Sequence, residues 1–595
     1  MAQYYNNIFE YIKAKEVAYR LPIRMNDSWD WSMVDHIKTT ENYNNSQLNN
    51  GKNEWTPIKN ITRPILNLQH RTEDIELKDV QLYVDDPDQF HLSLLVKKYH
   101  DDVFVQENDL DTFFDELNVS RIDFGGGISK KLDKPAPEVV PLQSIKFCNQ
   151  KDILGAPFAL VHEYSPDELM DMAKFGWGKR ENGATHSIDE VIVLSREDDK
   201  ECIEVYEVHG SLPKRFAEVT DSEEYETRMF IVCFYQDKDS TEKSGVILYT
   251  AKEDTRDKFK LIKRDPVYGR GLGFGGAEEL FEAQVWTTYD MIRMQNMLDA
   301  AAVTILKSTD PTVTAKHPNG LKHLKNLSIV DIAPNTDISQ VDTYPRNMAL
   351  FEKSVAEWEA HAQQMGGAND ALMGVSPASG TPFKLQELVT QEGKGLHEYR
   401  RGQYAKHIEE IYNDWIIPHI QKQICKDQSF LSELSVDEIQ YVADKMAINA
   451  WNKYFVEKVL SSGTFDEGEK DMFMQNWKDE FKKKGNKHFI DILKGEFKDT
   501  PLGVKVSVAG KSKNLATMTD KIVNIFRFAF SNPQGFAQVM QIPGMSRSFN
   551  EILEYSGLSP MDFNGIEQLA QQPTQQPTAQ PSPMQLPAQP QLNGQ

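Results

Sequence analysis

The sequence lacks the features that mark membrane and secreted proteins. In its 595 residues no apolar run approaches the roughly 18 residues that a transmembrane helix needs. The N-terminus, MAQYYNNIFEYIKAKEVAYR, has polar and charged residues where a signal peptide has its apolar core, so we expect neither export nor a membrane partner. The four cysteines lie far apart and in no metal-ligand or CxxC spacing, which favours reduced thiols in packed positions.

Positive charge is the second shortage. The chain has 66 Lys and Arg against 89 Asp and Glu, which gives a net charge of -23 at pH 7. Proteins that wrap DNA tightly neutralise its phosphates with Lys and Arg, so this balance excludes that class. It does not exclude a protein that lets DNA slide past it, because a positively charged surface would bind the DNA and slow its movement.

Nucleotide-binding motifs are present only in part. Gly271, Gly273 and Gly276 spell GxGxxG before a long helical pattern, but that fingerprint needs a buried parallel strand in front of it. The preceding KFKLIKRDPVYGR is too polar for such a strand and is interrupted by Pro266. We therefore favour a hinge that joins a sheet to a helix, and keep a nucleotide-dependent enzyme as the alternative. The predicted hinge consists of Gly269, Gly271, Gly273, Gly275 and Gly276.

The remaining catalytic motifs are incomplete. VKVSVAGKSKN resembles the end of a Walker A loop, but Lys505 occupies the position of its first glycine. The histidines, among them His397 and His407, form no HExxH motif or other paired metal spacing, so we interpret them as surface or core residues. We expect no enzyme activity, no cofactor and no metal.

Hydrophobic periodicity predicts an α+β fold. A helix is predicted over 8–19, and the runs EVIVL, CIEVYEV, MFIVCFY and GVILYTA, from about Asp189 onward, predict an antiparallel sheet. The earlier stretch RIDFGGGISKKLDKPAPE, with its glycines and prolines, is typical of a long loop. Nearer the C-terminus, PLGVKVSVAG predicts one more strand and residues 518–557 a compact helical piece.

Three long helical patterns follow the sheet. The first runs from Ala277 to Lys307, and its second half is apolar over too wide an arc for a single core. A neighbour on each side, as in a ring of copies, would explain that arc. The second, Arg346 to Met365, has a clean apolar stripe and stops at two glycines, and the third runs from Leu385 to about Ile424. An apolar stripe in the first half of the first helix is formed by Phe281, Val285, Tyr289 and Ile292.

Two segments separate these helices. The module between the first and second helices is turn-rich, and its Lys316, Lys322 and Lys325 either contact phosphates or belong to a solvated surface. The stretch ANDALMGVSPASGTPFK, between the second and third helices, is a long loop of the kind that is usually functional or disordered. The Gln- and Pro-rich C-terminal segment cannot bury a core, so we expect disorder there.

The order of these segments resembles the portal proteins of tailed double-stranded DNA bacteriophages, of the podovirus type, and also those of crAss-like phages. The matching pieces are VYEVHGSLP, YGRGLGFGGAEELFEAQVWTTYDMIRMQNMLDAA and MGVSPASGTPFKLQELVTQEGKGLHEYRRGQYAKHIEEIYNDWIIPHI. The resemblance covers roughly residues 189–420 and rests on order and spacing more than on invariant letters.

The resemblance implies a portal-like fold with a β-rich wing, long stem helices, a small α/β clip and a helical crown. The implied boundaries are 1–276 for the wing, 277–307 and 346–366 for the stem helices, 308–345 for the clip, 367–384 for the tunnel loop, 385–515 for the wing helix and the return to the wing, 516–565 for the crown and 566–595 for a disordered tail. The implied DNA-channel residues of the tunnel loop are Met373, Val375, Ser376, Ser379, Thr381 and Lys384, and the implied clip residues that meet partners are Lys316, Lys322 and Lys325.

The same resemblance implies a homo-dodecameric ring at one capsid vertex of a virion, made in the cytoplasm of a bacterial host. Its implied partners are double-stranded DNA in the channel, the major capsid protein, the terminase large subunit and head-tail adaptor or tail proteins. ATP would be hydrolysed by the terminase. A lumen rich in carboxylates would keep DNA from adhering, and the acidic residues of the implied stem are Glu278, Glu279, Glu282, Asp290, Glu352, Glu357 and Glu359. Another virion assembly or scaffold-like protein is the alternative.

Overall fold

The computed structural model describes most of the first 484 residues and little beyond them. The described residues are 5, 7–46, 58–84, 90–132, 136–197, 201–217, 224–236, 243–302, 306–309, 332–340, 348–368, 372–373, 395–424, 436–461, 468–484, 502–506 and 527. The chain divides into two units, Met1–Val508 and Ala509–Gln595, and every element named below belongs to the first. The predicted crown and disordered tail lie outside the described residues, apart from Arg527.

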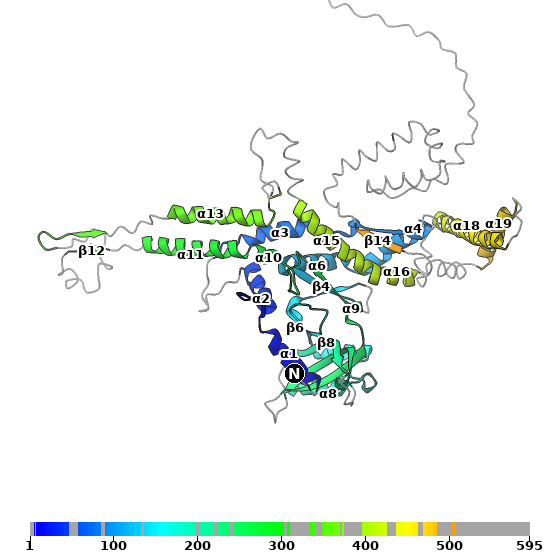
Figure 1. The fold of residues 1–595 in the computed structure, drawn as a ribbon, viewed down its shortest axis with the longest axis horizontal. Coiled ribbons are helices and arrows are strands. Elements are labelled where there is room, and N and C mark those ends of the chain that lie inside the picture. The colour runs from blue at the N-terminus through cyan, green and yellow to red at the C-terminus, as the bar shows by residue number, and fades with distance from the viewer. Residues whose placement is uncertain are drawn as a thin grey trace, which may run out of the picture. The chain divides into compact units, whose positions relative to one another are not determined.

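A five-stranded antiparallel sheet is the largest sheet of this α+β fold (Figure 1). Its strand order is β10-β9-β8-β7-β6, so neighbours in the sheet are also neighbours in the sequence. The strands are β6 (Ile145–Phe147), β7 (Phe158–Tyr164), β8 (Ile203–Pro213), β9 (Tyr225–Gln236) and β10 (Lys243–Lys252). The last three confirm the strands predicted at CIEVYEV, MFIVCFY and GVILYTA.

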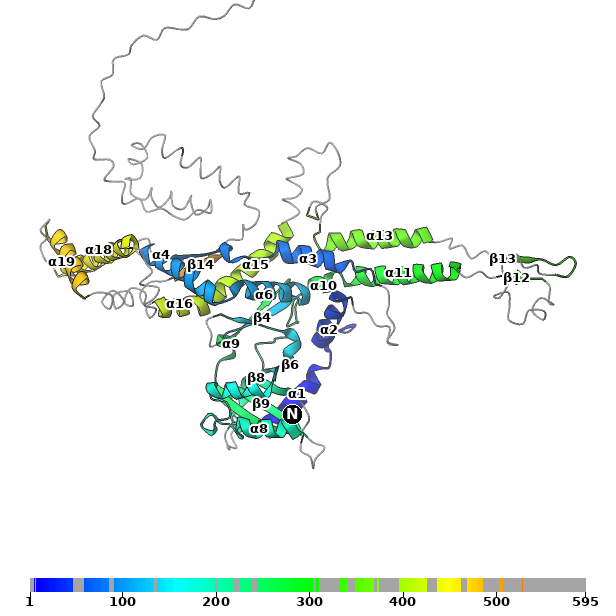
Figure 2. The ribbon, with the colours of Figure 1, turned by 180° about the vertical axis from the view of Figure 1, so that it is seen from behind.

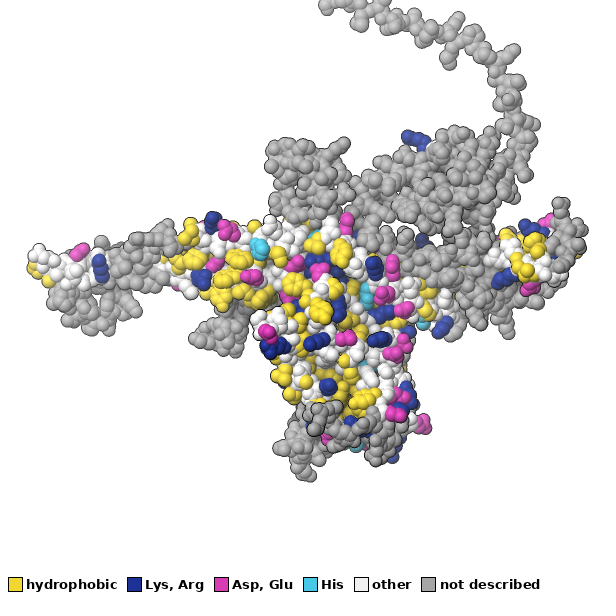
Figure 3. All heavy atoms as spheres, viewed as in Figure 1, with side chains coloured by type: hydrophobic (Ala, Val, Ile, Leu, Met, Phe, Trp, Pro, Cys, Tyr) yellow, Lys and Arg dark blue, Asp and Glu magenta, His cyan; other side chains and the backbone are white. Residues whose placement is uncertain are grey.

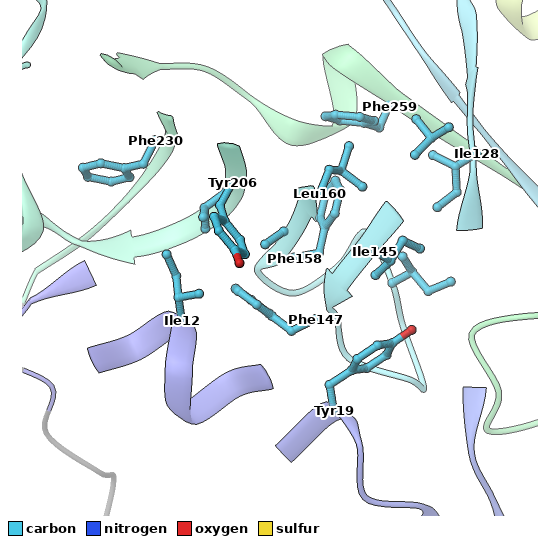
Figure 4. Packing of buried hydrophobic residues seen from close by; sticks show 14 of the residues in the cluster. Ile12, Tyr19, Ile128, Ile145, Phe147, Phe158, Leu160, Tyr206, Phe230 and Phe259 are labelled. Atoms are coloured by element: carbon cyan, nitrogen blue, oxygen red, sulfur yellow. The ribbon is translucent and has the colours of Figure 1, made fainter. Parts of the chain in front are cut away.

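Both faces of this sheet are buried. Since successive side chains along a strand point to opposite faces, each strand contributes to both cores. On β9, Met229 and Ile231 pack under α7 (Pro166–Met172) and α8 (Ile188–Glu197). Phe230 and Val232 belong to the core on the other face, which α1 (Ile8–Tyr19) covers with Ile12 and Tyr19 (Figure 4). The predicted helix over 8–19 is confirmed.

The EVIVL segment is helical, so the strand predicted there is wrong. It lies in α8, where Val191 and Ile192 are buried against the sheet. A capping box begins the helix: Ser187 donates its backbone N–H to Glu190, and its hydroxyl accepts the Glu190 N–H at 3.3 Å. The SIDE sequence carries this helix-start signal, which outweighs the β-branched run that follows.

The glycine-rich stretch at 125–130 is a strand rather than the predicted loop. β4 (Gly126–Lys130) is the central strand of a three-stranded antiparallel sheet, between β11 (Phe259–Lys263) and β5 (Glu138–Val140). Every residue of β4 is buried. Glycine is needed at Gly126 because a Cβ there would lie 2.9 Å from the Ile262 carbonyl oxygen.

Helices form the second large core of the first unit. It joins α4 (Phe90–Tyr99), α6 (Leu110–Phe124), α15 (Gly395–Ile411) and α16 (Ile417–Ile424) around buried side chains such as Phe114, Tyr404 and Ile420. A π-helical turn, Tyr412–Ile416, connects α15 to α16 without a break, as the long third helical pattern predicts from residue 395 onward. Its first residues, 385–394, lie outside the described residues.

The other described elements are smaller or flank these cores. They are the hairpin β1 (Ile23–Asn26) with β2 (Trp29–Trp31), the helices α2 (Met33–Asn44), α3 (Thr62–Thr72), α5 (Val105–Glu107), α9 (Thr255–Lys258), α18 (Val436–Leu460) and α19 (Glu469–Lys484), and the antiparallel pair β3 (Val80–Val84) with β14 (Leu502–Val506). The strand predicted in PLGVKVSVAG is confirmed as β14.

A pair of long helices completes the unit. The single turn α10 (Gly276–Glu279) leads into α11 (Phe281–Ala302), and α13 (Met348–Met365) lies beside α11 (Figures 1 and 2). The helix predicted over 277–307 is therefore interrupted at Leu280 and ends earlier. Between α11 and α13 the chain forms the antiparallel strands β12 (Leu306–Ser308) and β13 (Ile338–Gln340).

Candidate functional site: the long helix pair and the ion cluster at its base

The long helix pair is antiparallel, and its register is set by two contacts. The Trp286 and Trp358 rings stack at 6.2 Å, and one turn further along α11 the Ser354 hydroxyl donates to Asp290 Oδ2 at 2.6 Å. The residue number rises on α11 as it falls on α13, which is the signature of antiparallel helices. Asp290 is buried, so this hydrogen bond lies inside the pair.

The face that α11 buries within the chain is largely polar. Besides Ala283 and Met294, its buried residues are Gln284, Thr287, Thr288 and Asp290. Gln284 is fully buried: its Oε1 accepts the Ile61 N–H at 2.8 Å and its Nε2 donates to the Lys59 carbonyl at 2.8 Å. The start of α11 is therefore tied to the segment before α3 by hydrogen bonds as well as by the apolar contacts of Ala283 and Ile61 within one small core.

The aromatic residues of α11 are partly exposed, although Trp286 stacks on Trp358 of α13 and the Phe281 ring contacts Tyr43 at 5.1 Å. Phe281, Trp286 and Tyr289 are 39%, 41% and 54% exposed. Figure 3 shows hydrophobic side chains gathered on the surface of this helix pair, and exposed large apolar residues of the pair also include Leu298, Leu350 and Met365. The stripe predicted from Phe281 to Ile292 is thus not the face that α11 buries within its own chain.

A buried carboxylate, Glu73, lies at the base of the pair. Glu73 ends α3 and is completely buried. Its Oε2 accepts from Arg121 Nη2 at 2.9 Å, and its Oε1 accepts from Arg264 Nη2 at 3.2 Å. His397 Nδ1 lies 3.1 Å from Oε1, and Arg400 Nη1 lies 3.9 Å from it. We call Glu73, Arg121, Arg264, His397 and Arg400 the ion cluster.

The ion cluster keeps Glu73 charged. Burial alone would raise the pKa of Glu73, but Arg121, the hydrogen bond from His397, Arg264 and Arg400 together hold that pKa well below its ordinary range. A buried charge is tolerated only when its partners surround it. Here the partners come from α6, from the turn after β11 and from α15, so one carboxylate fastens three parts of the fold.

Further ion pairs extend the cluster to the helix pair. Arg400 donates to Asp265 at 2.5 Å and to Glu279 of α10 at 3.2 Å. Arg270 forms a two-pronged pair with Glu278, also on α10, at 2.9 and 2.8 Å. Both acidic residues at the start of the proposed stem are therefore bound by arginines of the same chain.

Gly269, Gly271, Gly273 and Gly275 of the predicted hinge lie between β11 and α10, and Gly276 begins α10. Gly271, Gly273, Gly275 and Gly276 are buried. A Cβ on Gly273 would lie 1.6 Å from the Arg264 carbonyl oxygen, and one on Gly275 would lie 2.6 Å from the Asp123 carbonyl oxygen. Only Gly269 of the five has the left-handed backbone, with φ of 80°. These glycines permit close packing of backbone on backbone, and their role as a hinge stays a prediction.

The same packing weighs against the nucleotide alternative. β11 runs antiparallel to β4, whereas the dinucleotide fingerprint follows a parallel strand. The Gly273 N–H donates to the Gly125 carbonyl at 3.0 Å and the Gly271 N–H to the Gln150 carbonyl at 2.7 Å. These amides are therefore already used within the chain and do not form an anion cradle.

A second buried carboxylate joins the two larger sheets. Glu207 on β8 accepts from Lys130 of β4 at 2.6 Å and lies 2.8 Å from both His162 Nε2 and His209 Nε2. Burial would raise the pKa of Glu207, but His162, His209 and Lys130 hold it well below its ordinary value. Burial also lowers the pKa of His209, whose ring lies against Phe158 and Phe259.

Most of the predicted partner residues fall outside the described part of the chain. This holds for Val375, Ser376, Ser379, Thr381 and Lys384 of the tunnel loop and for Lys316, Lys322 and Lys325 of the clip. Met373 is described and is 39% exposed. His397 and His407, which the sequence places on the surface or in the core, are both buried.

The ion cluster as a unit is not predicted from the sequence. In sequence Glu73, Arg121, Arg264 and Arg400 are far apart, and no spacing connects them. The one local signal is the HEYRR segment of α15, which supplies His397, Arg400 and Arg401 on one side of the helix. Arg401 pairs with the buried Asp79 at 2.6 Å.

Within the described residues, no group of three or more His, Cys, Asp and Glu side chains is arranged to hold a metal ion. No helix in that part of the chain is both long and apolar enough to cross a bilayer.

No model of a known protein family matches the chain, and no curated protein matches it. Among solved structures, one titled as the virion of a native gene transfer agent particle aligns over 92% of this chain and 99% of that chain. The sequence identity is 9% and the TM-score is 0.31. A TM-score of this size carries no argument about fold or function.

Proposed function

We propose that the chain is a subunit of a ring-forming portal at a capsid vertex, through which double-stranded DNA is packaged and ejected. One observation carries the proposal: α11 buries polar side chains within its own chain and leaves its aromatic residues exposed. Exposed apolar patches of this kind mark surfaces that meet another protein. Neighbouring copies on either side of the helix pair would cover Phe281, Trp286 and Tyr289.

The order of the segments supports the same proposal. Two long antiparallel helices enclose a small module, of which β12 and β13 are described, and a long segment after α13 precedes α15. In the proposed portal, α11 and α13 are the stem, residues 308–345 the clip and 367–384 the tunnel loop. The partners would be the capsid protein, the terminase large subunit and head-tail adaptor proteins, with ATP hydrolysis left to the terminase.

The charge of the proposed channel follows from the exposed carboxylates alone. Glu278, Glu279 and Asp290 are bound within the chain. The exposed acidic side chains of the pair are Glu282, Asp299, Glu352 and Glu357, of which Glu357 forms a surface ion pair with Lys353 at 3.5 Å. We propose that these, rather than the full set expected from the sequence, keep DNA from adhering.

Negative-stain imaging and native mass spectrometry of the purified protein test the ring. We expect closed rings with an axial channel in the wild type, and fewer rings in Tyr289→Lys, which places a charge on the exposed aromatic face. Gln295→Lys is the matched control, because Gln295 is also exposed on α11 but is not part of that aromatic set. A monomer at high concentration would refute the portal, and assemblies without a channel would favour another virion assembly protein.

A second experiment tests the tunnel loop. Replacing residues 376–381 by a short flexible linker should leave ring formation intact and reduce DNA retention or packaging. If rings fail to form, the loop is structural and the proposed role is wrong.

A further inference from the structure

One stripe of exposed residues runs along α11. Glu282, Trp286, Tyr289 and Arg293 are spaced at i, i+4, i+7 and i+11, so they share one side of the helix, and all four are exposed. Trp286 stacks on Trp358 with one face and is still 41% exposed. Among the described residues Glu282 has no ion-pair partner. This set, which we call the exposed stripe, therefore combines two aromatic rings with an unpaired carboxylate.

The opposite side of α11 is held by the start of α3. Gln284 accepts the Ile61 N–H at 2.8 Å and the Thr62 N–H at 3.4 Å. An α-helix turns about 100° per residue, so Glu282 and Trp286, each two positions from Gln284, point about 200° away from it. Residues 61–62 therefore lie across α11 from the exposed stripe.

The exposed side of α3 carries positive charge. Arg63, Asn67 and Arg71 are exposed at i, i+4 and i+8, and the other side of α3 is buried in a small core with α10 and α11. Neither arginine is ion-paired within the part of the chain that the structure describes. Arg63 directly follows the segment held by Gln284, so it belongs to the side of the helix pair away from the exposed stripe. We call Arg63, Asn67 and Arg71 the basic face of α3.

The neighbouring cations already have partners in their own chain. Lys59, just before α3, is paired with Glu359 of α13. Arg293, at the far end of the exposed stripe, pairs with Asp290 at 3.3 Å. Neither cation is left to balance the unpaired carboxylate of the exposed stripe.

A ring of copies brings the two unpaired groups together. In a cyclic ring the contact is heterologous, so one side of each copy meets the opposite side of the next. When the ring axis runs along the helix pair, the rotation between copies keeps each residue at its own level. Arg63 of one copy then faces the next copy at the level of Gln284. Glu282 lies two residues, or about 3 Å, from that level.

We propose that the exposed stripe of each copy docks on the basic face of α3 in the next copy, with Arg63 paired to Glu282 beside Trp286. A guanidinium can bind a carboxylate and lie over an aromatic ring at the same time. Aromatic residues and arginine are also enriched where proteins meet. This inference rests on the proposed ring and names the contact that joins its copies.

Charge reversal tests the contact, because each reversed residue repairs the other across the interface. Arg63→Glu and Glu282→Arg should each raise the protein concentration needed for ring assembly about ten-fold, since like charges then face each other. An equimolar mixture of the two variants should assemble again, with the two kinds of copy alternating. Sedimentation velocity measures the assembly. With one variant labelled with ¹⁵N, native mass spectrometry should show equal numbers of the two in each ring.

Two double variants control for changes in total charge. Arg63→Glu/Glu282→Arg should assemble like the wild type. Arg63→Glu/Asp299→Arg has the same net charge and should stay as weak as Arg63→Glu, because Asp299 is exposed on α11 but lies about 25 Å from Glu282 along the helix. Denaturant unfolding of dilute subunits checks that each variant folds.

The outcomes separate this contact from the proposed function. Wild-type rings without rescue in the mixture overturn the contact and leave the portal standing, whereas rescued assemblies without a channel support the contact and remove the portal. A wild-type protein that stays monomeric refutes both. If a reversal variant fails to fold, Arg63→Gln and Glu282→Gln decide: their effects on assembly should not add in the double variant if the two residues meet, and additive effects overturn the contact.

Discussion

The ion cluster and the long helix pair place their side chains in opposite ways. In the ion cluster, charges that usually face water are buried, and each finds its partner within the same chain. In the helix pair, aromatic side chains that usually form a core are exposed, and the buried face of α11 is polar. The charges of the cluster are paired within the chain, whereas the aromatic side chains of α11 are left partly exposed. We propose that the first region serves folding and the second association.

Removing the central charge of the cluster should have the largest effect. Glu73→Gln leaves Arg121, Arg264 and Arg400 without their shared counter-ion, and breaking a buried pair costs about 3–5 kcal/mol. Denaturant unfolding at fixed protein concentration measures the loss. A change below about 1 kcal/mol would show that the arginines find other partners.

The same variant predicts a pH effect. Because the folded chain holds the pKa of Glu73 below its ordinary value of 4.5, the carboxylate stabilises the fold above that pH. The contribution is lost as the pH falls through the folded-state pKa. The stability difference between wild type and Glu73→Gln should therefore shrink on acidification, as unfolding curves from neutral to acid pH would record. A difference that grows on acidification would contradict the sign.

Adding a side chain at the glycine-rich junction between β11 and α10 should cause the next largest loss of stability. Gly273→Ala places a Cβ 1.6 Å from the Arg264 carbonyl oxygen, so backbone must move. Such overpacking costs about 1–3 kcal/mol. Gly402→Ala in α15 is the matched control, since no atom lies within 4 Å of its Cβ position, and a helix interior gains about 0.5–1 kcal/mol from this change. Equal behaviour of the two variants in denaturant unfolding would argue against close packing at the junction.

Gln284 tests the polar face of α11. Gln284→Met keeps the length of the side chain but leaves the Ile61 N–H and the Lys59 carbonyl without their partner. Buried groups left unpaired cost about 1–3 kcal/mol, so we expect a loss near the lower end of that range in unfolding experiments. A stabilised variant would mean that water satisfies both groups.

A substitution on the exposed aromatic face should change the free energy of unfolding least and self-association most. Tyr289→Gln changes a side chain that is 54% exposed, so the free energy of unfolding of a dilute subunit should stay within about 0.5 kcal/mol. Sedimentation velocity should at the same time show weaker self-association. A large loss of subunit stability without a change in association would reverse the comparison between the two regions.

The sequence was a good guide where local periodicity decides the structure. The alternation in β8, β9 and β10 is visible in the letters because these strands meet a core along their length, and the stripe of α13 is visible although only Val355 and Ala362 of that helix are buried. It misled where a local signal was read with too little context. α8 has β-branched residues but a capping box, and β4 has glycines because neighbouring backbone lies close to it.

The ion cluster could not be predicted, because its partners meet only in the folded chain. Glu73 ends α3, Arg264 follows β11 and Arg400 belongs to α15. A single sequence gives no information on which of its many charges are buried. The polar inner face of α11 was missed for a related reason: its aromatic residues predict burial, and the structure leaves them partly exposed.

The pairing of β3 with β14 sets an order of events during synthesis. Residues 80–84 cannot form their strand pair until residues 502–506 have been synthesised. At ordinary rates of translation this takes about 20 to 80 s longer. By then α11 and α13 have already been made, with their aromatic residues, while the strand that completes the β3 edge is still missing. Nascent chains on one messenger RNA therefore present the aromatic residues of α11 before β3 has paired with β14. A chaperone or a delay in subunit release would be most useful to this protein in that interval.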